Sequence, residues 1–108
     1  MMSKAVAVID EVVRRIVAVA RPDKIVVFGS QARGDVHPRS DLDVLVVRDS
    51  SEPRYLRSAP LYTALADLPA EIEVFVYTPA EVAEWANVRQ ALVTTALREG
   101  EVVYERAA

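Results

Sequence analysis

The chain has 108 residues, a formal net charge of −3 and no cysteine. This length suits a single domain over residues 1–108 with one core. The negative charge excludes a general attraction to nucleic acid or anionic membranes, so direct binding of nucleic acid is not expected. The lack of cysteine excludes disulfides, zinc–thiolate sites and thiol nucleophiles, and it fits a reducing cytoplasm. No apolar run approaches the roughly 20 residues of a membrane span, and the N-terminus has no signal-peptide pattern.

The first half of the chain predicts one helix and two strands. A helix begins after Ser3, a plausible N-cap, and the sequence Arg21-Pro22-Asp23 ends it. Residues 25–28 and 42–47 are short, β-branched apolar runs, which are typical of strands buried on both faces. The apolar residues of the helix recur at helical spacing: Ala5, Val8, Ile9, Val12, Val13, Ile16 and Val19.

The second half predicts further helices around a third strand. A less regular helix is expected between residues 52 and 68, interrupted by Pro60, and a strand over residues 71–77. Thr78 and Glu81 form the pattern of a capping box, and a further helix is expected from about residue 87 to 98. A short strand, residues 101–104, follows Gly100. The order of elements predicts an α/β (α+β) domain with a small mixed central sheet flanked by helices.

Carboxylates open the second and third strands. Asp41 and Asp43 are two residues apart, so in a strand they point to the same face. Two adjacent carboxylates repel each other unless a cation lies between them, and Mg²⁺ is the natural oxygen-binding candidate. If the third strand pairs with the second, Glu73 comes level with the aspartates, whereas Glu71 is expected to be solvated. Three such carboxylates could hold two metal ions about 3.5–4 Å apart, as in nucleotidyl transfer.

A glycine–serine turn precedes these carboxylates. Gly29 avoids a Cβ clash with an approaching phosphate, and Ser30 adds a hydroxyl donor beside backbone amides. Arg33 is close enough to contact a triphosphate, or it pairs on the surface with an aspartate. Ser40 either contacts the nucleotide or shapes the loop, and His37 is expected to be an exposed loop residue.

These residues carry a family resemblance. Residues 29–34 (Gly-Ser-Gln-Ala-Arg-Gly), followed by residues 40–43 (Ser-Asp-Leu-Asp), resemble the signature of the nucleotidyltransferase superfamily with the DNA polymerase β-type palm. The chain looks most like the minimal nucleotidyltransferases, which are often paired as antitoxins with a HEPN-domain toxin. The resemblance implies a palm domain that binds ATP with two Mg²⁺ ions and transfers a nucleotidyl group as pyrophosphate leaves.

The resemblance also assigns expected roles. Gly29 and Ser30 match the phosphate-binding pair, and Asp41 and Asp43 match the metal-binding aspartates. Glu73 stands where the family usually has aspartate, and its carboxylate reaches one methylene further, as a metal ligand or general base. The implied acceptor is a tyrosine hydroxyl on a HEPN-type toxin in the cytoplasm.

Two other functions stay open. The chain could neutralise a partner by binding alone, with the acidic cluster serving only structure. Transfer to a small molecule would need a second, pocket-forming domain, which the sequence does not show. Residues 54–57, which include two arginines and Tyr55, could contact an acidic partner or the nucleotide, but a solvated helix face is the favoured interpretation.

Overall fold

The computed structural model describes residues 4–28 and 42–107. The described helices and strands, in chain order, are α1 (Lys4–Ala20), β1 (Lys24–Phe28), β2 (Leu42–Val47), α2 (Arg54–Arg57), α3 (Ala59–Leu65), β3 (Ile72–Tyr77), α4 (Pro79–Trp85), α5 (Leu92–Glu99) and β4 (Glu101–Glu105). Among the described helices, none has the length and apolar character that crossing a membrane requires.

The described strands form one mixed four-stranded sheet in the order β3-β2-β1-β4. β1 runs antiparallel to β2 and to β4, whereas β2 and β3 are parallel. A parallel pair needs a crossover connection, and α2 and α3 lie in the segment that joins β2 to β3. The sheet confirms the predicted α/β (α+β) class with a small mixed sheet flanked by helices.

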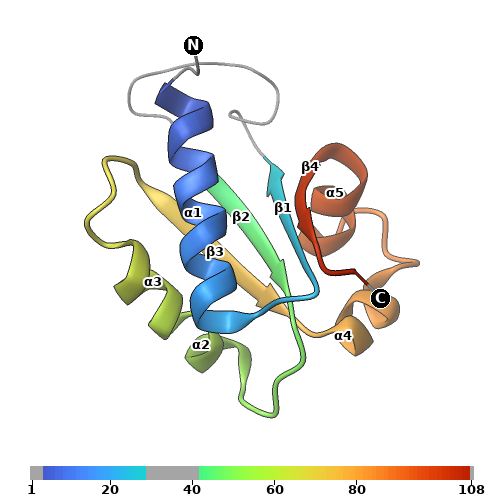
Figure 1. Cartoon of the computed structure of the whole chain (residues 1–108). Coiled ribbons are helices and arrows are strands. Elements are labelled where there is room, and N and C mark those ends of the chain that lie inside the picture. The colour runs from blue at the N-terminus through green and yellow to red at the C-terminus, as the bar shows by residue number, and fades with distance from the viewer. Residues whose placement is uncertain (1–3, 29–41, 108) are drawn as a thin grey trace.

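Helices α1 and α3 cover one face of the sheet (Figure 1). Alternate strand residues point to this face, so the apolar side chains of β1, β2 and β3 meet the apolar stripe of α1. The buried members of this cluster are Val12, Ile16, Ala20, Ile25, Val27, Leu42, Val44, Val46, Leu61, Leu65, Val74 and Val76.

The opposite face packs against α5. Its buried cluster contains Val26, Leu45, Val47, Tyr77, Val93 and Ala96. Helices therefore cover both faces, which explains why residues 25–28 of β1 and 44–47 of β2 are continuously apolar rather than alternating. Gly100 follows α5 directly and lies so close to β1 that an added Cβ would be 2.6 Å from Val26 Cγ1.

Three helix predictions need correction. The helix expected between residues 52 and 68 is two helices that meet at Ser58, and Pro60 lies in the first turn of α3, where its missing N–H costs nothing. The helix expected from residue 87 begins only at Leu92, after a polar segment. Val19, expected on the apolar face of the first helix, is 50% exposed, and Ala20 faces the core instead. Ser3 lies outside the described residues.

Arg57 is not the solvated helix residue that the sequence favours. Its side chain is only 9% exposed and pairs with Glu81, which opens α4. The Arg57 guanidinium also donates to the backbone carbonyls of Glu52 and Val76, at 2.7 and 3.3 Å. Arg57 therefore ties α2 to β3 and α4.

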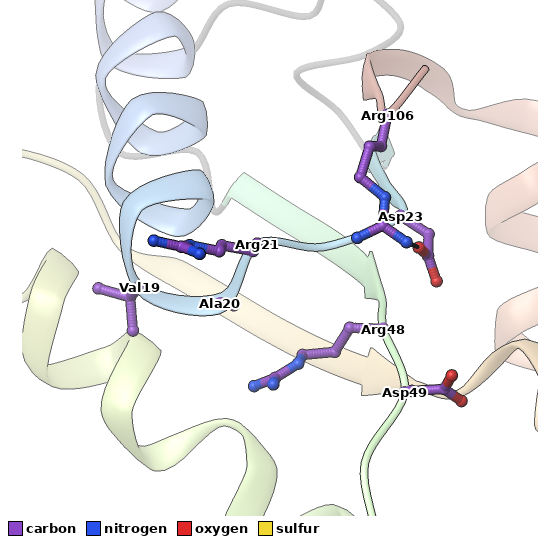
Figure 2. Close-up of a pocket in the computed structure, with 7 residues that line it drawn as sticks. All are labelled: Val19, Ala20, Arg21, Asp23, Arg48, Asp49 and Arg106. Atoms are coloured by element: carbon purple, nitrogen blue, oxygen red, sulfur yellow. Dashed lines mark hydrogen bonds and ion pairs between the residues drawn. The ribbon is translucent and has the colours of Figure 1, made fainter. Parts of the chain in front are cut away.

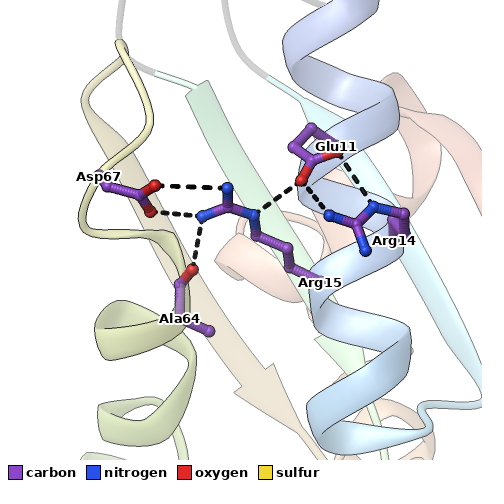
Figure 3. Close-up of polar contacts among 5 residues, drawn as sticks. All are labelled: Glu11, Arg14, Arg15, Ala64 and Asp67. Carbon is purple, nitrogen blue, oxygen red and sulfur yellow. Dashed lines mark hydrogen bonds and ion pairs between the residues drawn. The ribbon is translucent and has the colours of Figure 1, made fainter.

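A second ion-pair network joins α1 to α3 (Figure 3). Arg15 of α1 pairs with Asp67 and donates to the carbonyl of Ala64 at 2.9 Å. Hydrogen bonds from Arg14 and Arg15 lower the pKa of the Glu11 carboxyl to about 2. The hydrogen bond from Arg15 also lowers the pKa of Asp67. Both carboxylates therefore stay charged at neutral pH and hold the Arg15 guanidinium between the two helices.

Candidate functional site

A row of three residues crosses the sheet where β1 ends and β2 begins. Asp43 pairs with Phe28 of β1 on one side and with Glu73 of β3 on the other. This is the end of the sheet at which β2 and the parallel β3 both start (Figure 1). The predicted adjacency of the second and third strands is confirmed, and Glu73 lies level with Asp43.

The acidic pair lies on the sheet face that α5 covers further along. Residues alternate along a strand, so Asp43 shares its face with Leu45, and Glu73 shares its face with Phe75. Leu45 is buried and Phe75 packs against the same cluster. Asp43 is half-buried and Glu73 is exposed. The two carboxylates thus stand where the apolar part of this face ends, and Glu73 is the more exposed of the two.

The carboxylate oxygens of Asp43 and Glu73 suit a hard divalent cation. Paired residues of adjacent strands are about 4.8 Å apart, and in a parallel pair they point to the same face. Two carboxylates at that separation offer oxygen ligands of the kind that Mg²⁺ takes, together with substrate phosphates. Within the described residues, no hydrogen bond or ion pair engages the Glu73 carboxylate. Asp43 and Glu73 are therefore the side chains here that would hold a metal ion.

The other predicted site residues lie outside the described part of the chain. These residues are Gly29, Ser30, Arg33, Ser40 and Asp41, and His37 lies there too. The described residues alone contain no group of three metal-ligating side chains. By sequence, Gly29 directly follows Phe28, the strand partner of Asp43, and Asp41 precedes Asp43 by two residues. The roles expected for all five site residues stay predictions.

Sequence reasoning did not identify an aromatic pair beside the carboxylates. The rings of Phe28 and Phe75 have centroids 6.0 Å apart and are tilted by 45°. Phe28 pairs with Asp43, and Phe75 lies two residues after Glu73 on the same face. The strand alternation in residues 71–77 predicts the placement of Phe75, but its contact with Phe28 depends on the register of three strands. The pair therefore lies on the same sheet face as the carboxylates of Asp43 and Glu73.

Comparison with known proteins identifies the family. The family described as the nucleotidyltransferase domain matches residues 8–103. A bifunctional uridylyltransferase/uridylyl-removing enzyme of Pseudomonas entomophila is 36% identical over 77 residues, which are 68% of this chain and 9% of that protein. The corresponding enzyme of Pseudomonas putida strain GB-1 is 33% identical over 72 residues, which are 65% of this chain and 8% of that protein. The chain thus spans less than a tenth of the length of these relatives.

Two solved structures share the fold. A crystal structure of a toxin–antitoxin with AMP-PNP superposes with a TM-score of 0.57 at 16% identity, covering 90% of this chain and 73% of that one. A candidate nucleotidyltransferase from Sulfolobus solfataricus superposes with a TM-score of 0.61 at 16% identity, covering 98% of this chain and 91% of that one. Together, the sheet topology and a family match that extends from α1 into β4 show that this chain belongs to the nucleotidyltransferase domain family.

Proposed function

We propose that this chain transfers AMP from Mg-ATP to a hydroxyl group of a partner protein. One observation carries the proposal: Asp43 and Glu73 lie level on parallel strands, on one sheet face, next to the strand end from which Gly29 and Ser30 follow. The general activity, nucleotidyl transfer, comes with the family. The acceptor and the nucleotide are the proposed part.

The chemical step uses this chain's residues in distinct roles. The acceptor hydroxyl oxygen attacks the α-phosphorus of ATP, the bond from that phosphorus to its bridging oxygen breaks, and pyrophosphate leaves. The hydroxyl proton passes to the Glu73 carboxylate as the general base. Asp41 and Asp43, with Glu73, would hold two Mg²⁺ ions, which supply charge neutralisation at the phosphates when bound. Gly29 and Ser30 cradle the phosphates, and Arg33 and Ser40 contact the nucleotide.

The length of the third carboxylate matters to this assignment. Glu73 carries one more methylene than the aspartate that the family usually places there. Its exposed position on β3 leaves room for this longer side chain. Glu73 is therefore able to reach past Asp43 towards the acceptor, which suits a base that must meet an incoming hydroxyl.

Two parts of the proposal are suggested by the toxin–antitoxin structure that shares this fold: that protein pairs with a partner protein, and it was crystallised with an adenine nucleotide analogue, AMP-PNP. We place the chain in the same kind of pair, as the antitoxin of a HEPN-type toxin, with a toxin tyrosine as the acceptor in the cytoplasm. On this proposal residues 1–108 act as one nucleotidyltransferase domain.

Uridylyl transfer is the second candidate. It is favoured by the 36% identity to the Pseudomonas entomophila enzyme, whose name describes uridylyl transfer and removal. The same carboxylates would serve either nucleotide, because the reacting phosphate and the metal ions are common to ATP and UTP. Only the contacts to the nucleobase, adenine or uracil, differ.

The test uses intact mass spectrometry. The purified chain is incubated with a HEPN-type protein encoded next to it, Mg²⁺, and either ATP or UTP. We expect the partner to gain AMP, at a rate at least about a hundredfold lower with Asp43→Asn or Glu73→Gln. Glu101→Gln, an exposed change on β4, is the matched control and is expected to leave the rate unchanged.

The other outcomes discriminate between the candidates. A gain of UMP alone replaces adenylyl transfer with uridylyl transfer. If the partner gains neither nucleotide, and Asp43→Asn still silences it fully, then the chain acts by binding alone and the proposed reaction is wrong.

A further inference from the structure

A polar hollow lies at the end of the sheet opposite to Asp43 and Glu73. Its volume is about 380 Å³, and its lining includes Arg21, Asp23, Arg48 and Arg106 (Figure 2). These residues flank the start of β1 and the ends of β2 and β4. From Asp43 to Val47, the last residue of β2, the strand rises about 13 Å, so the hollow is separate from the candidate nucleotide site. Its size is within the range of small-molecule sites.

Two of the three arginines in the hollow have no partner in the described part of the chain. Arg106 pairs with Asp23. No hydrogen bond or ion pair engages the guanidinium of Arg21 or of Arg48. Figure 2 shows these two guanidinium groups on one side of the hollow, whereas the carboxylate of Asp49 points to the other side. With three arginines and two aspartates, Asp23 and Asp49, the lining has a net charge of +1, on a chain whose net charge is −3.

The backbone of Arg21 is strained. Arg21 has φ 46°, the only positive φ of a non-glycine residue in the described part of the chain. It caps α1, because its N–H donates to the carbonyl of Val17 at 3.1 Å, the single bond of a left-handed helix cap. Glycine or asparagine usually occupies that position at lower cost. Strained residues of this kind are concentrated at functional sites, so the strain at Arg21 is consistent with a binding role for its side chain.

Sheet hydrogen bonds hold the rim of the hollow in place. The Asp23 N–H donates to the carbonyl of Val47 at 2.8 Å, and the Arg106 N–H donates to the carbonyl of Asp23 at 2.9 Å. The Arg48 N–H donates to the carbonyl of Tyr77 at 3.0 Å. The Cα atoms that carry the three arginines are therefore positioned before any ligand arrives, which lowers the cost of binding.

We propose that this hollow binds a small phosphate-bearing anion through Arg21 and Arg48. A phosphoryl group carries up to two negative charges and three acceptor oxygens, so it can pair with both guanidinium groups at once. A single carboxylate has one charge and two oxygens, which one arginine fork satisfies. The Arg106–Asp23 pair lies beside the phosphate without competing for it, because the two residues neutralise each other.

The test measures binding of inorganic pyrophosphate by backbone amide NMR, with EDTA present and about 0.15 M salt, so that metal-dependent binding at Asp43 does not contribute. We expect shifts confined to the backbone amides of Arg21, Asp23, Arg48 and Asp49, since Pro22 has no N–H. We expect Arg48→Gln to weaken binding at least tenfold. Arg21→Gly is expected to weaken binding equally while the protein unfolds at the same or a higher temperature, because glycine relieves the strain. Arg98→Gln, an exposed change on α5, is the matched control.

Several results would overturn this proposal. One is the absence of localised shifts at about 10 mM pyrophosphate, which corresponds to binding weaker than any useful affinity. Another is equal binding by Arg48→Gln and the Arg98→Gln control. A third is that acetate or a glutamate-rich peptide shifts the same amides while pyrophosphate does not, because the occupant would then be a carboxylate. None of these results bears on nucleotidyl transfer, since the two sites lie at opposite ends of the sheet.

Discussion

Replacing Gly100 with alanine tests how tightly α5 and β4 are packed against β1. The backbone there has φ −84° and ψ 175°, which any residue can adopt, so only the space around the Cα requires glycine. An added Cβ would lie 2.5 Å from the Ala96 carbonyl oxygen, 2.6 Å from Val26 Cγ1 and 2.8 Å from the Val27 carbonyl oxygen. Two of these atoms are backbone and cannot rotate away.

The expected cost follows from these contacts. Overpacking a core costs about 1–3 kcal/mol, and the backbone contacts place Gly100→Ala near the upper end of that range. Alanine has less conformational entropy than glycine in the unfolded chain, which offsets about 0.5 kcal/mol of this loss in the free energy of unfolding. The net loss of about 2–2.5 kcal/mol is a large part of a total stability of about 5–15 kcal/mol. It lowers Tm by roughly 10–15 °C in a domain of this size.

Urea and thermal unfolding, followed by circular dichroism, measure this loss. We expect a lower urea midpoint with an unchanged m-value, because the same surface is exposed on unfolding. Glu101→Ala, at the next and exposed position, is the control and is expected to change stability by less than about 0.5 kcal/mol. A Tm for Gly100→Ala within about 2 °C of the wild type would show that the chain at Gly100 does not pack this closely against α5 and β1.

Three further predictions concern the contacts that join α2, β3 and α4. Arg57→Ala leaves Glu81 and two backbone carbonyls without their buried donor, and we expect urea unfolding to show a loss of about 2–3 kcal/mol. Thr78→Ala removes the side-chain acceptor of the Glu81 N–H, at 3.1 Å, and should cost about 1 kcal/mol, whereas exposed Thr63→Ala should cost less than half of that. The hydrogen bond from Arg57 lowers the pKa of Glu81, so this carboxylate stabilises the fold above pH 4.5 and loses that effect as the pH falls through its lower folded pKa. The stability difference between wild type and Glu81→Gln should therefore shrink on titration below pH 4.5, and a constant difference would contradict the assignment.

The sequence was most informative where local chemistry decides the structure. β2 has the predicted bounds, and β1 begins one residue earlier than predicted, because continuous β-branched runs are difficult to place anywhere except in a covered sheet. The capping box at Thr78 is also confirmed, since its hydrogen bonds involve only residues within one turn. The error at Pro60 arose because the sequence alone does not show whether a proline interrupts a helix or begins one.

Contacts between distant segments were harder to predict. Asp43 and Glu73 lie level because β2 and β3 pair in parallel. The sequence alone does not show that these two strands are neighbours. Arg57 was assigned to a solvated face because its partner, Glu81, is 24 residues away and lies on another helix. The strain at Arg21 is a property of its backbone dihedrals, and no pattern of residue types shows it.

We propose that Asp43 and Glu73 hold the metal that a nucleoside triphosphate brings to this end of the sheet. Isothermal titration calorimetry with Mg²⁺ and AMP-PNP tests it most directly, because no acceptor is needed. We predict binding that EDTA abolishes, that Asp43→Asn weakens at least tenfold, and that Glu101→Gln leaves unchanged. If folded Asp43→Asn and Glu73→Gln proteins both bind Mg-AMP-PNP as tightly as the wild type, these carboxylates do not form the site.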